Sequence, residues 1–223
     1  IAEVKQAPRL AYGDDYQVSH HESIETGEVF DYTSSFRQGR FQTGLLGIHQ
    51  IENAGMAITL LDTYCQETGR ELVANDLVAQ ALEETSWPGR LEIVSKDPLV
   101  ILDGAHNPHA IEALLVTLQE RFADYQKEIL FTCIKTKALK DMLDLLSALP
   151  DTELTLTHFE DGRATDKEVL KEAARSRKLN YQSWQEFLDQ KMTDDEEKKT
   201  VRIVTGSLYF LSQVRAYLME RKN

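Results

Sequence analysis

Two glycine turns carry the residues best suited to chemistry. Each follows an apolar segment, and they span residues 103–108 (DGAHNP) and residues 205–207 (TGS). Asparagine is a favoured N-cap and proline a favoured first helical residue, so we expect a helix to begin directly after the first turn. A helix start offers free N–H groups and a positive dipole end to an anion. The carboxyl of Asp103, the imidazole of His106 and the hydroxyl of Ser207 could therefore hold one small, polar, anionic ligand.

The elements around these turns predict an α/β fold. Apolar segments and helical patterns alternate after residue 90, which indicates βαβ units and a mostly parallel sheet with both faces covered. We predict strands at 99–102, 128–134, 153–159 and 200–205, and helices at 108–122, 138–149, 166–177, 183–192 and 208–220. Parallel strands end at one sheet edge, where ligands bind in open sheets, so we expect Asp103, His106 and Ser207 to share that edge.

The first part of the chain has a different rhythm. Alternating segments at 9–12, 16–22 and 28–33 predict a small antiparallel sheet, and we expect residues 1–47 to be less regular than the rest. A helical period starts at His49 and stops near Gly69, and Asn75 is predicted to cap a second helix. The sequence SWPG at 86–89 breaks the pattern, so we place the boundary between domains 1–86 and 87–223 there.

Composition excludes several classes of protein. The net charge is −12 and the pI is near 5.0, which argues against non-specific binding to nucleic acid or to an anionic membrane. No apolar run approaches the roughly 20 residues of a membrane span. Cys65 and Cys133 lack metal-ligand spacing, so no metal site is predicted and a reduced, cytoplasmic setting is expected. No Ser-His-Asp or Cys-His order is evident, which disfavours a covalent nucleophile.

Four motifs in a fixed order resemble one family. They are residues 47–54 (GIHQIENA), 87–90 (WPGR), 103–110 (DGAHNPHA) and 205–210 (TGSLYF). Together they resemble the folylpolyglutamate synthase / dihydrofolate synthase family, within the wider Mur ligase group, and the resemblance covers essentially the whole chain. It implies the remnant of a central ATPase domain followed by a Rossmann-like C-terminal domain that binds glutamate.

The resemblance implies a role for each site residue. Asn53 resembles the residue that reads adenine, Arg90 the arginine that reaches the ATP phosphates, and Asp103 an acid that contacts the nucleotide. His106 and Ser207 resemble glutamate-pocket residues, and Asp103 or His106 would assist catalysis. Each has a structural alternative: Asn53 could bond a neighbouring backbone group, Arg90 could pair with a surface acid, and Ser207 could be only an N-cap.

The implied chemistry is ATP-dependent addition of L-glutamate to folate or dihydropteroate through an acyl phosphate, by an enzyme expected to be a monomer. The family's phosphate loop contains Gly-Lys, and no Gly-Lys pair occurs in these 223 residues. We therefore expect a fragment that is inactive alone, with the Mg²⁺ ligands upstream of Ile1. The alternatives are another amino-acid-adding Mur-type ligase and a non-catalytic module that binds a small molecule.

Overall fold

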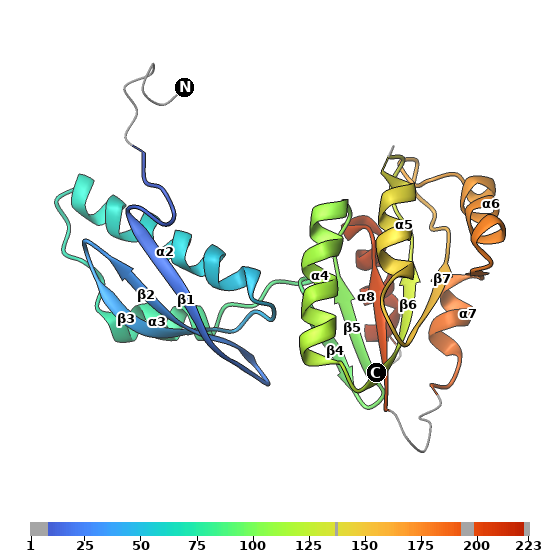
Figure 1. The fold of residues 1–223 in the computed structure, drawn as a ribbon, viewed down its shortest axis with the longest axis horizontal. Coiled ribbons are helices and arrows are strands. Elements are labelled where there is room, and N and C mark those ends of the chain that lie inside the picture. Colours follow the sequence, from blue (N-terminus) through green and yellow to red (C-terminus); the bar gives the residue numbers. More distant parts are fainter. Residues whose placement is uncertain (1–8, 137, 193–198, 221–223) are drawn as a thin grey trace. The chain divides into compact units, whose positions relative to one another are not determined.

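The computed structural model describes residues 9–136, 138–192 and 199–220. The chain divides into two compact units, Ile1–Ser86 and Trp87–Asn223 (Figure 1). Each unit has its own sheet and its own hydrophobic core, so each is described by itself.

The first unit is a three-stranded antiparallel sheet packed against two helices. Its elements are β1 (Tyr16–Ile24), β2 (Gly27–Ser34), β3 (Gln38–Thr43), α2 (His49–Glu67) and α3 (Asn75–Glu83). Alternate side chains of β2 face inward, and Phe30 and Tyr32 pack there on Ile51 and Ile58 of α2. The expectation of low regularity is wrong for residues 16–43, because the three strands pair in nearly continuous register and α2 covers their apolar face. Residues 1–8 lie outside the described residues.

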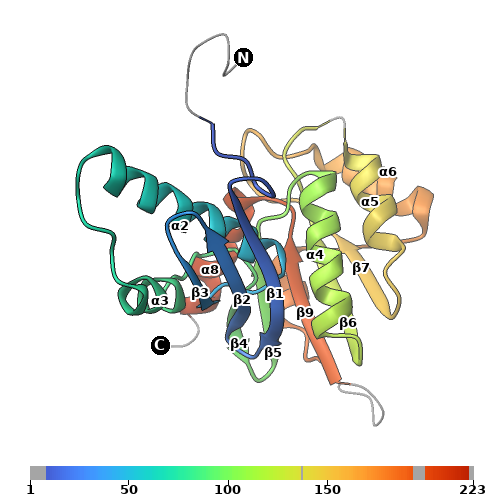
Figure 2. The same cartoon turned by 60° about the vertical axis from the view of Figure 1, so that its left-hand side comes forward.

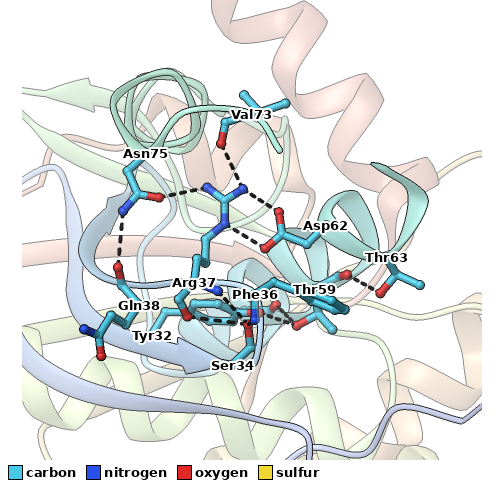
Figure 3. Close-up of polar contacts among 11 residues, drawn as sticks. Tyr32, Ser34, Phe36, Arg37, Gln38, Thr59, Asp62, Thr63, Val73 and Asn75 are labelled. Atoms are coloured by element: carbon cyan, nitrogen blue, oxygen red, sulfur yellow. Dashed lines mark hydrogen bonds and ion pairs between the residues drawn. The ribbon is translucent and has the colours of Figure 1, made fainter. Parts of the chain in front are cut away.

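A buried arginine ties the elements of this unit together (Figure 3). Arg37, in the turn between β2 and β3, donates from Nε to Asp62 Oδ2 at 2.7 Å and from Nη2 to Asp62 Oδ1. It also donates to the Val73 carbonyl at 2.9 Å and to Asn75 Oδ1 at 3.0 Å. The predicted cap role of Asn75 is wrong: Asn75 is the first residue of α3, Ala74 is the N-cap, and the Asn75 amide donates to the Gln38 carbonyl at 3.2 Å.

The second unit has a six-stranded sheet in the order β4-β5-β9-β6-β7-β8. The strands are β4 (Glu92–Lys96), β5 (Leu99–Asp103), β6 (Tyr125–Phe131), β7 (Thr152–Leu156), β8 (Asn180–Tyr181) and β9 (Lys199–Thr205). Only the β4–β5 pair is antiparallel, so the predicted α/β fold with a mostly parallel sheet is confirmed. The sequence reading missed β4 and β8 because one is a short hairpin partner and the other has two residues.

Helices cover both faces of this sheet. They are α4 (Pro108–Arg121), α5 (Leu139–Ser147), α6 (Lys167–Arg177), α7 (Trp184–Asp189) and α8 (Leu208–Glu220). Helices α4 and α5 lie on one face and α8 on the other (Figures 1 and 2). Strand residues of one parity, including Leu102, Leu130 and Val204, form a core cluster with Phe210 of α8. This alternation decides which strand-end side chains face the start of α8.

Candidate functional site

The two glycine turns are neighbours at one edge of the six-stranded sheet. Strands β5 and β9 pair in parallel, with Asp103 opposite Thr205 at their carboxyl ends. The Thr205 hydroxyl donates to the Ala105 carbonyl at 3.4 Å, which links one turn to the other. The predicted location of Asp103, His106 and Ser207 at a common edge is therefore confirmed.

Asp103 organises the backbone around it. Its carboxyl is buried, with 7% of the residue exposed, and it accepts hydrogen bonds from Ala105 N at 2.9 Å and Leu91 N at 3.0 Å. Gly104 N donates to the Gly89 carbonyl at 2.7 Å. These contacts fasten the residues on both sides of position 90 to the turn that follows β5. Sequence reading did not find this structural role, because Asp103 and Leu91 lie apart in the chain.

Arg90 is held at this edge by its two neighbours, both of which have positive φ angles, 72° for Gly89 and 44° for Leu91. The residue is partly buried. Its guanidinium forms no ion pair or side-chain hydrogen bond within the described part of the chain, so the alternative of a surface ion pair is not what the structure shows. A cation with unused donors suits phosphate oxygens.

His106 presents one ring nitrogen to a ligand. Its Nδ1 lies 2.7 Å from the Gly104 carbonyl oxygen, and a carbonyl can only accept, so Nδ1 carries the proton. In the neutral ring Nε2 is then an acceptor, and the residue is exposed. Next to it, the Asn107 side chain accepts from Ala110 N at 2.9 Å, which confirms Asn107 as the N-cap of α4.

Gly206 is required by the close packing of the second turn. Its φ is 113°, and a Cβ added there would lie 1.7 Å from the Thr132 carbonyl oxygen. The turn places Ser207 directly before α8, where 3% of it is exposed. Its hydroxyl accepts no hydrogen bond from the described backbone of α8 and makes none with any other described residue, so the N-cap alternative is not what the structure shows.

Asn53 lies in the other unit, on an exposed position of α2. Its amide donates to Gln50 Oε1 at 2.9 Å, and Gln50 Nε2 lies 3.0 Å from His49 Nε2. The neighbour that Asn53 bonds is thus a side chain rather than the backbone. Sequence reading missed Glu28, a fully buried acid that accepts from Gly47 N at 2.7 Å and so fixes the turn before α2.

A second cation lies against Tyr209 of α8, and sequence reading missed it. Arg163 stacks on Tyr209, with its Cζ 3.4 Å from the ring centroid, and it donates to both carboxyl oxygens of Asp161. These Arg163 hydrogen bonds lower the pKa of Asp161 to about 2. The pair is contributed by a loop far from either motif in sequence, so no local pattern could have indicated it.

Cys133 bears on nucleophilic chemistry, and the grouping of acidic, histidine and cysteine side chains bears on metal binding. Burial raises the pKa of Cys133, which keeps its thiol protonated. No group of three or more His, Cys, Asp or Glu side chains in residues 9–136, 138–192 and 199–220 could hold a metal ion. In the same ranges, no helix has the length and apolarity that a bilayer crossing requires.

Comparisons with known proteins show the family of the chain. Residues 89–208 match the family described as "Mur ligase, glutamate ligase domain". The chain is 30% identical over 221 residues to the dihydrofolate synthase/folylpolyglutamate synthase of Bacillus subtilis, covering 97% of this chain and 50% of that protein. It is also 30% identical over 217 residues to the folylpolyglutamate synthase of Lacticaseibacillus casei, covering 96% and 49%. The chain therefore spans about half the length of the curated relatives it matches.

Solved structures give the same result. A complex of FPGS with AMPPCP and folate superimposes with a TM-score of 0.74 at 26% identity, covering 97% of this chain and 48% of that one. The Mycobacterium tuberculosis folylpolyglutamate synthase complexed with ADP and AMPPCP has a TM-score of 0.80 at 23% identity, which supports the fold alone, and the match covers 97% of this chain and 51% of that one.

Proposed function

Because the chain belongs to the Mur ligase family, whose glutamate ligase domain matches residues 89–208, we propose that it is part of an ATP-dependent ligase that adds L-glutamate to folate or dihydropteroate. The observation that carries the proposal is the convergence of Arg90, Asp103, His106 and Ser207 at one sheet edge. On this proposal, residues 1–86 belong to the ATP-binding domain and residues 87–223 form the glutamate-binding domain.

The proposed reaction has two steps. An oxygen of the folate carboxylate attacks the γ-phosphorus of ATP, ADP leaves, and an acyl phosphate forms. The glutamate amine then attacks the acyl carbon, and the C–O bond to phosphate breaks. On this proposal Arg90 binds the phosphate oxygens in the first step, and Asn53 and Asp103 contact the nucleotide.

His106 and Ser207 serve the second step on this proposal. An amine must lose a proton to attack, and His106 Nε2 is a base exposed at the site edge. The start of α8 supplies N–H donors to a glutamate carboxylate, and Ser207 adds a hydroxyl beside them. No group of three or more His, Cys, Asp or Glu side chains that could hold a metal ion occurs among the described residues, and the proposal assigns no Mg²⁺ ligand to them.

Activity requires groups that the 223 residues do not contain. No Gly-Lys pair occurs in the sequence, so the lysine of a phosphate loop is absent from this chain. We therefore expect the isolated chain to incorporate no labelled glutamate into tetrahydrofolate or dihydropteroate in the presence of ATP and Mg²⁺. The complete ligase, of the length of the relatives, should incorporate it. Turnover by the pure 223-residue chain would contradict the expectation, and a complete ligase without glutamate-dependent turnover would contradict the function.

Substitutions at the proposed glutamate site should mainly affect the kinetic parameters for glutamate. Ser207→Ala is expected to weaken glutamate binding by about 1 kcal/mol if the hydroxyl donates one hydrogen bond. His106→Ala should cost more, because the imidazole contacts both the substrate and the reacting centre on this proposal. The measurement is the KM for glutamate and kcat of the complete ligase with ATP saturating.

Two matched variants control these measurements. Ser212→Ala removes an exposed hydroxyl of α8 that bonds only the Tyr209 carbonyl in the described structure, and His109→Ala removes an imidazole that is 97% exposed. Neither should change KM or kcat. If Ser207→Ala and His106→Ala behave like these controls, the two residues serve only the turns.

A further inference from the structure

Thr132 presents a buried hydroxyl that has nothing to bond. It follows β6 directly and is 0% exposed. Across residues 9–136, 138–192 and 199–220, its Oγ1 is the one buried side-chain nitrogen or oxygen without a hydrogen-bond partner. Leaving such a group unsatisfied destabilises the folded state, so an isosteric valine would give a more stable fold. A group that harms the fold in this way is expected where function requires it.

The position of Thr132 places this hydroxyl at the proposed glutamate site. Thr132 N donates to the Thr205 carbonyl at 3.3 Å, so the strand ladder continues to this residue. The Thr132 carbonyl oxygen is the atom that a Cβ on Gly206 would strike. Thr132 has the same parity as Leu130, which packs in the cluster that contains Phe210 of α8. Its side chain therefore lies on the α8 face of the sheet, beside the turn that starts α8.

Ser207 lies in the turn that starts α8. Its hydroxyl makes no hydrogen bond with another described residue, but unlike the Thr132 hydroxyl it is not a fully buried atom without a partner. Both residues therefore adjoin the turn before a 13-residue helix, whose first backbone N–H groups favour an anion. Binding of a carboxylate there would favour reorientation of both hydroxyls.

We propose that Thr132 is a positioning residue of the glutamate site. When the carboxylate of the amino-acid substrate binds at the start of α8, the Thr132 hydroxyl donates to the Ser207 hydroxyl, which in turn donates to the carboxylate. The inference rests on the proposed function. On this inference the Thr132 hydroxyl is hydrogen-bonded only when the substrate is bound. In the free chain it has no partner among the described residues.

Thr132→Val distinguishes a role in substrate binding from a role in folding, because it removes the hydroxyl and keeps the volume of the side chain. In the complete ligase, with ATP and folate saturating, the variant should raise the KM for glutamate about fivefold and change kcat little. Thr132→Ser, which keeps the hydroxyl, should retain the wild-type KM. In the 223-residue chain, the denaturant midpoint of Thr132→Val should equal or exceed that of the wild type. A purely structural hydroxyl would show the reverse, a lower midpoint with an unchanged KM.

The control is Thr117→Val, which removes a buried hydroxyl that bonds the Ala113 carbonyl at 3.1 Å within α4, and it should leave the KM unchanged. Thr132→Ala provides a second variant if the valine does not fold. Equal KM values in wild type and Thr132→Val, with a raised KM in Ser207→Ala, would overturn the inference alone. A wild-type ligase that does not use glutamate would overturn the proposed function and this inference with it.

Discussion

Replacing Arg90 with methionine is expected to lower kcat/KM for ATP of the complete ligase about 10²–10³-fold, the usual effect of removing a preorganised donor from developing charge. The guanidinium makes no ion pair or side-chain hydrogen bond within the described residues, so its loss leaves no described acid without a partner. Methionine keeps an apolar stem of similar length. The fold should therefore survive, as circular dichroism would show, while the activity falls.

Arg215→Met is the matched control for Arg90. Arg215 belongs to the same unit, and its Nε donates to Glu92 at 2.9 Å in an exposed pair. Its removal should leave kcat/KM for ATP unchanged. The kcat/KM for ATP of Arg90→Lys should lie between those of the wild type and Arg90→Met, because an ammonium keeps the charge but not the planar fork. An Arg90→Met ligase with wild-type kcat/KM for ATP would remove Arg90 from the site.

The largest expected effect on stability follows from Arg37→Met. Asp62 is 0% exposed, and the substitution would leave its carboxylate buried without the guanidinium. Breaking a buried pair on one side costs about 3–5 kcal/mol. The Val73 carbonyl and the Asn75 side chain would also lose their donor. Amide hydrogen exchange of α2 in the 223-residue chain measures the loss within the first unit.

Arg40→Met tests whether burial causes the effect. Arg40 pairs with Asp31 in the same sheet, but the two side chains are 54% and 45% exposed, so little measurable loss is expected. The double variant Arg37→Met/Asp62→Leu should recover part of the stability, because it removes the charge that would otherwise be buried alone. Equal protection of α2 in wild type and Arg37→Met would show that the pair does not hold the unit together.

Local chemistry in the sequence was enough to predict the α/β fold, and the Mur ligase family was recognisable from four short motifs. The period of apolar residues located most strands and helices, and Asn107 with Pro108 indicated the start of α4. Parallel pairing then placed the DGAHNP and TGS turns at one edge. These inferences succeeded because capping, periodicity and strand direction depend on residues that are neighbours in the chain. Asn75 failed as a cap because a distant guanidinium and the Gln38 carbonyl engage its side chain.

The tertiary structure alone decided which groups at the edge are engaged and which remain available. Asp103 bonds Leu91 and Ala105, whereas Arg90 and the Thr132 hydroxyl meet no partner among the described residues. The Arg37–Asp62 pair joins residues 25 positions apart. Such facts depend on sheet register and on the packing of helices over it, because a shift of one residue turns every side chain to the other face. The sequence by itself determined which residue types reach the site, and the packed fold determined what each of them bonds there.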